Sequence, residues 1–542
     1  MSTSSPTAPA PSLKCKWGAG KQSLHKMAKR VTKVGIVGNL KKFKAITLAL
    51  ALAASCQGFA IEAPADAGAD WRGPDGSTAL QWAVYEGDVD RAKALIADGA
   101  DVAAANNYGS NSMQLAAEVA NVDMLKLLLD AGANPDSPNP EGQTALMLVA
   151  RTGNVAAAKL LVDKGANVNA IEAWGQQSAL MWASARRHPA MMDYLLEEGA
   201  DINAQSINRD YRRHLTKEGR AKSLDAGGLT PLLYSVRENC IECIDVLVKH
   251  KVDLDLPDPE GVAPLTLAAL NSHWDIAKKL IEAGADVQQW DVYGQAPLLA
   301  AIGRRTANPQ QPNESLNETD GLTVVRMLLE KGANPNMQLF LRPSKQRGGA
   351  SRGTTPLIAA AGNADVESIQ LLLQHGADVK LLQADRQSPV SALAGARGNP
   401  NRQVEALNLL VAAGADLNVV AVHHHLQRTR GGSAMHYAVR ANNARMIEAL
   451  VQSGADINMK DFDGLTALDY AMAHGQVGFL QMRQPPNTKV ADQLRTLGAT
   501  GELEAEPYWP LVGPPFYYPW SIFPLDPAAE ANALVPGSFD HL

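Results

Sequence analysis

Cysteine is scarce in this chain of 542 residues, and aromatic residues make up only 5% of it. Of the four cysteines, Cys15 and Cys56 lie near the N-terminus, so only Cys240 and Cys243 remain for the rest of the chain. No disulfide framework can be built from two cysteines. Hydrophobic residues still make up 46% and charged residues 20%, which is typical of a folded chain and unlike a disordered or fibrous one.

Catalytic motifs are also missing. The sequence contains no Gly-x-Ser-x-Gly, no His-Glu-x-x-His and no complete phosphate-binding loop. The stretch GAGKQS at 18–23 resembles that loop only in part, because Cys15 replaces its first glycine and Gln22 its Ser/Thr. The run His423–His425 does not predict a metal site, since consecutive strand residues point to alternate faces. We therefore expect a protein that is not an enzyme and has no metal or cofactor.

Charge is unevenly distributed. Residues 1–44 contain ten Lys or Arg and no acidic residue, so the other residues carry a formal charge of −16 within a total of −6. The basic stretch precedes the apolar run Ala45–Ser55 and then small residues, which is the pattern of a secretory signal. The sequence LAASC at 52–56 also resembles a lipobox. We expect residues 1–60 to be a leader, with either Cys56 as a lipidated first residue or cleavage after Ala60.

A repeat organises the remainder of the chain. The segment DGSTALQWAVYEGDVDRAKALIADGADV at 75–102 recurs as EGQTALMLVARTGNVAAAKLLVDKGANV at 141–168. Gly76, Gly109 and Gly142 are spaced at 33 residues. In each unit a Thr or Ser starts a short helix, and a second helix with a Leu-Leu pair ends at a Gly-Ala pair. Such helix pairs bury their apolar faces only by stacking on their neighbours.

These repeats resemble the ankyrin repeat over residues 75–500. The resemblance implies an all-α repeat solenoid of helix-turn-helix units connected by β-hairpin fingers. We expect about eleven repeats, at 75–107, 108–140, 141–173, 174–206, 227–259, 260–292, 293–338, 354–384, 385–419, 432–462 and 463–500. One insertion, at 308–321, falls between the two helices of a repeat, and three others enlarge the fingers.

The three enlarged fingers are basic, although the array is acidic. Their formal charges are +4 at 209–222, +4 at 341–353 and +2 at 423–432. Because ankyrin fingers project to one concave side, the resemblance brings these loops together, and they suit an anionic partner. The alternative is that they fold back onto the acidic array. The partner-binding candidates are Arg209, Arg212, Arg213, Lys217, Arg220, Arg342, Lys345, Arg347, Arg352, Arg428 and Arg430.

Aromatic residues near the finger tips are the second set of candidates. Tyr108, Trp174 and Tyr293 precede the repeat glycine, and Trp290 lies close by. Exposed rigid aromatics are common interface anchors, whereas packing between adjacent fingers is the alternative.

Other conspicuous side chains have structural interpretations. Trp82 and Trp182 occupy a leucine position of the first helix and are expected in the core. His436 matches the structural histidine of the ankyrin motif. Alignment with Asn121–Met124 places Cys240 at a helix start and Cys243 in a buried stripe, which favours two core thiols, although an oxidising compartment could link them.

The C-terminal segment 501–542 departs from the repeat. It is rich in Pro and aromatic residues, which excludes a helix and favours an extended backbone. The segment either caps the last repeat or docks onto another protein.

Together these features predict an exported scaffold that binds a protein with an acidic surface on its finger side. We expect the periplasm or an outer-membrane lipoprotein in a Gram-negative host, and secretion otherwise. Nucleic acid is not expected, because the acidic array would repel phosphates. Membrane association would require a lipid anchor or an uncleaved signal. The alternatives are an immunity or chaperone-like binder of one exported protein, or an enzyme with an unrecognised site.

Overall fold

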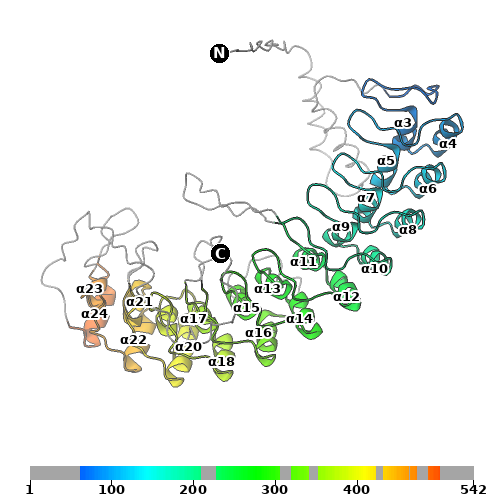
Figure 1. The fold of residues 1–542 in the computed structure, drawn as a ribbon. Helices are drawn as coiled ribbons and strands as arrows, with labels where there is room; N and C mark the ends of the chain where they lie inside the picture. Colours follow the sequence, from blue (N-terminus) through cyan, green and yellow to red (C-terminus); the bar gives the residue numbers. More distant parts are fainter. Residues whose placement is uncertain are drawn as a thin grey trace, which may run out of the picture. The chain divides into compact units, whose positions relative to one another are not determined.

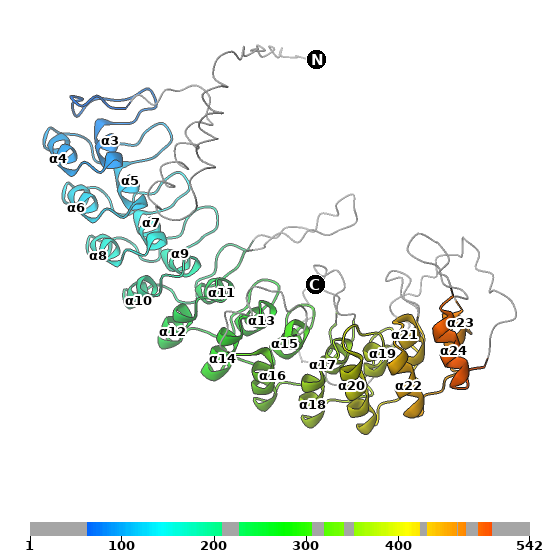
Figure 2. The same ribbon diagram turned by 180° about the vertical axis from the view of Figure 1, so that it is seen from behind.

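The fold is a stack of helix pairs, seen from two sides in Figures 1 and 2. The computed structural model describes residues 62–208, 227–305, 319–340, 352–422, 431–462, 464–472 and 486–500. These residues form 22 helices in eleven successive pairs. The chain divides into two compact units, and the helices belong to the one formed by Ala63–Arg72 and Gly76–Leu542. The other unit lies almost wholly outside the described residues.

First and second helices form two separate rows. The first helices are α3 (Ala79–Glu86), α5 (Ser112–Glu118), α7 (Ala145–Thr152), α9 (Ala179–Ala185), α11 (Pro231–Arg237), α13 (Pro264–Leu270), α15 (Pro297–Arg305), α17 (Pro356–Gly362), α19 (Pro389–Ala394), α21 (Ala434–Arg440) and α23 (Ala467–Ala471). The second helices are α4 (Val89–Ala97), α6 (Val122–Asp130), α8 (Val155–Asp163), α10 (Pro189–Glu197), α12 (Ile241–Lys249), α14 (Trp274–Ala283), α16 (Gly321–Glu330), α18 (Val366–Gln374), α20 (Pro400–Ala412), α22 (Ala444–Gln452) and α24 (Thr488–Thr496).

Local sequence signals determine where the helices begin and end. Thr78 caps α3 because its hydroxyl accepts the backbone N–H of Gln81 at 3.0 Å, while the Gln81 side chain accepts the N–H of Thr78 at 2.9 Å. The second helix α6 ends at Asp130, and Gly132 two residues later has a φ of 90°, in the left-handed region that favours glycine. There the N–H of Ala133 bonds back to the carbonyl of Leu128 at 3.0 Å.

The core runs between the two helix rows. One leucine of the second helix, such as Leu128, Leu161 or Leu247, is fully buried in successive repeats. The first helix contributes a matching residue, as Leu80 and Leu146 do. These residues belong to one hydrophobic cluster that extends along the array, as expected for repeats that cannot bury their apolar faces alone.

The fingers are tight turns with little strand pairing. Within the described ranges only isolated antiparallel bridges occur, for example between Ala105 and Asn111 and between Ile171 and Ser178. In the described residues the predicted β-hairpins are therefore reduced to single bridges, which occur around five of the turns. The predicted all-α repeat solenoid itself is confirmed, with eleven helix pairs for about eleven expected repeats.

A side-chain ladder joins the bases of successive fingers. In most repeats one polar side chain accepts the backbone N–H of a residue in the next repeat, at 2.7 to 3.1 Å. The acceptor and donor residues are Asp136 and Asn167, Asn169 and Asp201, Asn203 and Asp253, Asp255 and Asp286, Gln288 and Asn334, Asn336 and Asp378, Asn418 and Asp456, and Asn458 and Thr500. Ala103 and Lys380 occupy the same position and offer no acceptor. The ladder keeps neighbouring fingers in register.

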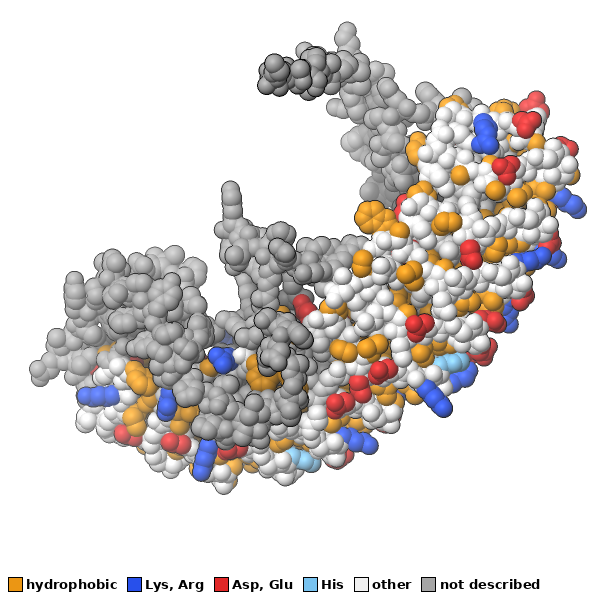
Figure 3. All heavy atoms as spheres, in the orientation of Figure 1, with side chains coloured by type: hydrophobic (Ala, Val, Ile, Leu, Met, Phe, Trp, Pro, Cys, Tyr) orange, Lys and Arg blue, Asp and Glu red, His pale blue; other side chains and the backbone are white. Residues whose placement is uncertain are grey.

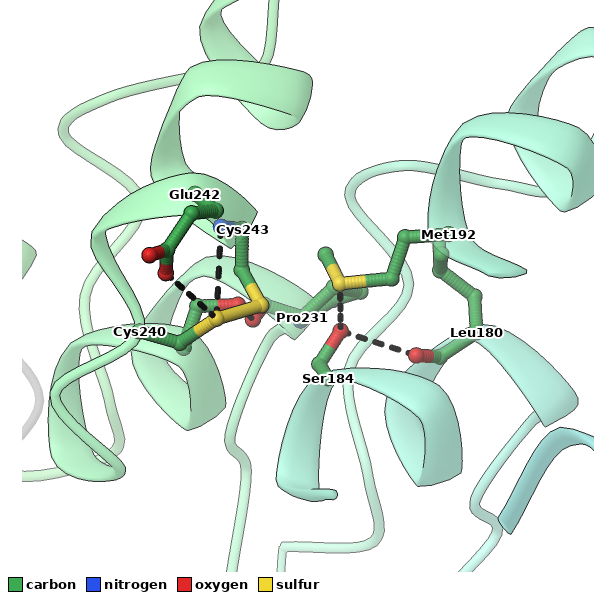
Figure 4. Close-up of a disulfide and its surroundings, with 8 residues drawn as sticks. Leu180, Ser184, Met192, Pro231, Cys240, Glu242 and Cys243 are labelled. Atoms are coloured by element: carbon green, nitrogen blue, oxygen red, sulfur yellow. Dashed lines mark hydrogen bonds between the residues drawn. A yellow bond between two sulfur atoms is a disulfide. The ribbon is translucent and has the colours of Figure 1, made fainter. Parts of the chain in front are cut away.

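Cys240 and Cys243 form a disulfide, so the interpretation as two free core thiols is wrong about their redox state. Both residues are buried, as expected, at 1% and 0% exposure. Cys240 caps α12 and Cys243 lies three residues later, so one helical turn brings their Cα atoms to 5.2 Å. Figure 4 shows the disulfide on the side of α12 that faces Ser184 and Met192 of the preceding repeat. Burial alone could not distinguish thiols from a disulfide.

The two expected core tryptophans are only partly buried. Trp82 and Trp182 pack against the core, but part of each ring reaches the surface. Trp82 lies edge-on to Tyr85 with ring centroids 5.8 Å apart, and the guanidinium of Arg151 lies 5.7 Å from the centre of the Trp182 ring.

In the part of the chain that the structure describes, no helix combines the length and the apolar character needed to cross a bilayer.

Candidate partner-binding surface

The finger tips near the start of the array present two exposed aromatic rings. Tyr108 is 72% exposed and Trp174 is 67% exposed. Each is positioned by an acceptor two residues earlier: the Asn106 side chain accepts the N–H of Tyr108 at 3.0 Å, and Glu172 accepts that of Trp174 at 2.6 Å. Because the turns are held by these bonds, the rings project from a fixed backbone.

The other two aromatic candidates lie between adjacent fingers. Trp290 is partly buried and meets Phe340 of the next finger edge-on, with ring centroids 5.2 Å apart. Tyr293 is also partly buried, and its carbonyl accepts the N–H of Phe340 at 2.9 Å. For Trp290 and Tyr293, packing between adjacent fingers therefore describes the contacts better than an exposed interface anchor does.

Most of the basic candidates lie outside the described residues. These are Arg209, Arg212, Arg213, Lys217, Arg220, Arg342, Lys345, Arg347, Arg428 and Arg430. Arg352 is described and partly buried, and its carbonyl accepts the N–H of Ala384 in the next finger at 2.9 Å. Cys56, Ala60, the run His423–His425 and the segment 501–542 are also outside the described ranges.

Sequence reasoning missed an acidic side chain between the exposed rings. Glu141 is exposed and occupies in its finger the position that Tyr108 and Trp174 occupy in theirs, one residue before the repeat glycine. The 33-residue spacing contained this signal, because residues 108, 141 and 174 are equivalent. Exposed Ile171, Val292 and Phe462 add further apolar surface on the fingers.

Two finger carboxylates have raised pKa values. Burial raises the pKa of Asp291 to about 6, although the backbone N–H groups of Gln295 and Tyr293 oppose the shift by bonding to its charged form. Burial also raises the pKa of Asp255, which accepts the N–H of Asp286 at 2.8 Å. Both groups stabilise turns rather than face a common cavity, so they do not form an acid–base pair.

The buried histidine His436 has a structural role in the fold. His436 is fully buried, its Nδ1 accepts the N–H of Ser433 at 3.1 Å and its Nε2 lies 3.0 Å from the carbonyl oxygen of Leu465. Burial lowers its pKa, so the ring is neutral. The predicted structural role of His436 is confirmed. Among the described residues, no group of three or more His, Cys, Asp or Glu side chains is arranged to hold a metal ion.

The second-helix side has a different character. Acidic and basic side chains alternate there, as Figure 3 shows along the row that contains α4 to α12. Several are paired, such as Lys164 with Asp130 at 2.8 Å and Lys249 with Asp193 at 2.7 Å. Exposed pairs of this kind contribute little stability. The aromatic residues of the described second helices, Tyr194 and Trp274, are buried, so they offer no exposed interface anchor. The finger tips are therefore the better candidate surface.

Helix pairs stacked through a continuous core, with tight fingers between them, define an α-helical repeat protein. Models of the ankyrin repeat match residues 48–139, 113–206, 211–291, 352–383 and 410–471. These matches cover more than half of the chain, which therefore belongs to the ankyrin-repeat family. Domains of this family generally bind other proteins.

The curated relatives come from diverse organisms. The chain is 24% identical to the E3 ubiquitin-protein ligase KEG of Arabidopsis thaliana over 55% of its own length and 16% of that protein. It is 26% identical to the B-cell lymphoma 3 protein homolog of Mus musculus over 48% of its length and 52% of that protein. An ankyrin repeat-containing protein of Treponema pallidum is 37% identical over 27% of this chain and 40% of that protein. The chain thus spans about half or less of these relatives.

Solved ankyrin repeat domains are also similar to parts of the chain. The domain of Bcl-3 is 24% identical and has a TM-score of 0.36, covering 42% of this chain and 94% of that one. The domain of human ASB11 is 23% identical and has a TM-score of 0.35, covering 49% and 98%.

Proposed function

We propose that this protein is an exported, non-catalytic scaffold that binds a protein partner on its finger side. The observation that carries the proposal is the pair of exposed aromatic rings, Tyr108 and Trp174, on turns held by hydrogen bonds. Aromatic side chains on a preorganised backbone bind at a low entropic cost, which is why they anchor many interfaces.

Export is supported by the N-terminal sequence and by the disulfide. The basic stretch before Ala45–Ser55 has the order of a secretory signal, with Cys56 and Ala60 as the alternative processing points. The Cys240–Cys243 disulfide is typical of an oxidising compartment. We propose the periplasm or an outer-membrane lipoprotein if the host is Gram-negative, and secretion otherwise. Intact-mass analysis of the purified protein tests this. Retention of residues 27–44, which directly precede the apolar run, would contradict removal of the leader.

The three basic fingers favour a partner that also carries an acidic surface. Their arginines and lysines contrast with an otherwise acidic array, so attraction to an anionic surface would be long-range and weakened by salt. An immunity or chaperone-like binder of one exported protein is a narrower form of the same function, in which a single partner would be recovered.

Affinity purification from the envelope fraction, followed by mass spectrometry, tests the scaffold. Wild-type protein and a Tyr108→Ala, Trp174→Ala double variant should be compared at low and moderate salt. We expect one or more proteins that the wild type recovers and the double variant loses. Recovery of no protein above background, or of the same proteins by both chains, would contradict binding through these rings.

A further inference from the structure

Three successive finger tips carry an aromatic, an acidic and an aromatic side chain. Tyr108, Glu141 and Trp174 each lie one residue before a repeat glycine, and all three are exposed. They belong to finger 2 (residues 101–110), finger 3 (134–143) and finger 4 (167–177).

Fingers 2 and 3 share one local geometry, whereas the turn of finger 4 has one more residue and its left-handed residue is Gln176 instead of the repeat glycine. The N–H of Glu141 bonds to the Asn139 side chain at 3.0 Å, as the N–H of Tyr108 does to Asn106. In finger 4 the longer Glu172 side chain accepts the N–H of Trp174 instead. In all three fingers the side chain therefore leaves a turn that is held by an acceptor two residues earlier.

The fingers are also in contact with one another. The carbonyl of Glu141 accepts the N–H of Ala173 at 2.9 Å, which joins finger 3 to finger 4. On the other side, Pro140 packs so closely on Gly109 that an added Cβ there would lie 2.6 Å from its ring. Glu141 is therefore flanked by the finger of Tyr108 and the finger of Trp174.

The charge of this surface has one sign. Residues 101–110, 134–143 and 167–177 contain no Lys or Arg, and their acidic side chains that reach the surface are Asp101, Asp136 and Glu141, whereas Glu172 is buried. A cation is attracted both by a carboxylate and by the faces of aromatic rings. Arginine suits such a place best, because its planar guanidinium pairs with a carboxylate and stacks on rings.

We propose that fingers 2 to 4 bind an arginine-containing, extended segment of a protein partner. One guanidinium pairs with Glu141, and Tyr108 and Trp174 contact the same segment on either side. This inference rests on the proposed protein-binding function and assigns the chemistry of the partner at this end of the array. It complements the basic fingers, which suit an acidic region of a partner.

A peptide titration tests the assignment on the full chain. The probe is an unstructured glycine- and serine-based peptide with spaced arginines, and its affinity is measured by calorimetry at low and moderate salt. Two control peptides have lysine or glutamate in place of each arginine. We expect the arginine peptide to bind, the lysine peptide to bind about threefold more weakly, and the glutamate peptide not to bind.

Variants then locate the site. Glu141→Lys should weaken arginine-peptide binding by more than about tenfold, because attraction becomes repulsion. Tyr108→Ala and Trp174→Ala should each weaken it by about threefold to tenfold, the range of one cation–π contact. The matched control is Glu330→Lys, which makes the same charge change at the exposed end of the second helix α16. Equal effects of Glu141→Lys and Glu330→Lys would overturn the assignment, since only net charge would matter.

The chain's own basic segment is the competing occupant. If the basic segment at 209–222 filled the site, the wild type would not bind the peptide, whereas a chain with Arg212, Arg213 and Arg220 changed to Gln would bind it. That outcome would overturn the proposal that a partner occupies the site.

Absence of peptide binding is distinguishable from absence of protein binding by the scaffold. Loss of envelope partners in the double aromatic variant, with no peptide binding by any chain, would retain the scaffold and reject its arginine-binding chemistry.

Discussion

The side chain of Asn203 accepts the backbone N–H of Asp253 at 3.1 Å, although the two residues are 50 positions apart in the sequence. The same bond joins other neighbouring repeats, as between Asn169 and Asp201 at 2.8 Å. The enlarged finger between Asn203 and Asp253 therefore does not interrupt the ladder. The core repeat keeps its register while the insertion is accommodated outside it.

The ladder should contribute measurable stability. Asn203→Ala removes the acceptor of the Asp253 N–H, and we expect a loss of about 1 kcal/mol in the free energy of unfolding, the usual contribution of one hydrogen bond. Lys380→Ala is the matched control, because Lys380 occupies the same position and cannot accept a hydrogen bond. It should change stability by less than about 0.5 kcal/mol. Chemical denaturation of the full chain measures both, and equal effects would argue against the ladder.

Asp291 should make stability depend on pH. The residue is 3% exposed, and burial raises the pKa of its carboxyl to about 6, above the 3.8 of an exposed aspartate. Between these two values the folded state binds more protons than the unfolded state, so this group's contribution to stability falls as pH rises from about 4 to 6. Asp291→Asn removes the buried charge and should stabilise the protein at pH 7 by up to about 3 kcal/mol.

The asparagine should keep the turn, because Asn106 and Asn139 already accept the same two N–H bonds in fingers 2 and 3. Denaturation midpoints at pH 4.5 and pH 7.5 compare the two chains, and Asp101→Asn controls for the loss of one exposed charge. A difference between wild type and Asp291→Asn that stays the same at both pH values would exclude the buried carboxylate as its cause.

Lys251 should be a weak point of the backbone. It lies where other repeats have the glycine of the Gly-Ala pair and adopts a φ of 59°, in the left-handed region that disfavours residues with a Cβ. Lys251→Gly should therefore raise the free energy of unfolding by about 1 kcal/mol. The reverse change, Gly132→Ala, should lower it by about the same amount, since a Cβ there meets no atom within 4 Å and only the backbone is strained. Thermal unfolding tests the pair, and shifts of the same sign would contradict this explanation.

Arg305 should contribute more to the free energy of unfolding than Arg402 does. The Nη1 of Arg305 lies 2.8 Å from Oδ1 of Asp365, whose side chain is fully buried, and its Nη2 lies 3.4 Å from Glu367. Arg402 pairs with Glu367 at 2.5 Å, and the side chains of both residues are partly exposed. Burial raises the pKa of Asp365, so loss of Arg305 leaves a costly buried carboxylate.

We therefore expect Arg305→Met to cost about 3 kcal/mol and Arg402→Met less than about 1 kcal/mol at pH 7. The Arg402 guanidinium lowers the pKa of Glu367 to about 2. The smaller contribution of Glu367 to the free energy of unfolding should therefore be lost as pH falls below about 4.5. Urea denaturation of both variants provides the comparison. Similar losses for Arg305→Met and Arg402→Met would show that burial of Asp365 is not the cause.

The sequence by itself determined the repeat and its helices. Thr78 and Thr144 mark helix starts because a hydroxyl at that position caps the free N–H groups of the first turn. Gly132 marks a helix end because the left-handed conformation there suits glycine. Both signals act within a few residues, so the 33-residue spacing was enough to place them.

Only the tertiary structure decided which finger residues are exposed. Tyr293 and Trp174 both precede a repeat glycine in the sequence, yet Tyr293 is partly buried and bonds to Phe340 of the following finger, while Trp174 remains 67% exposed. The raised pKa of Asp291 and the disulfide of Cys240 with Cys243 likewise depend on burial and on side-chain distances. Contacts between fingers are made by residues separated by insertions of variable length, so the local pattern that places a helix contains no information about them.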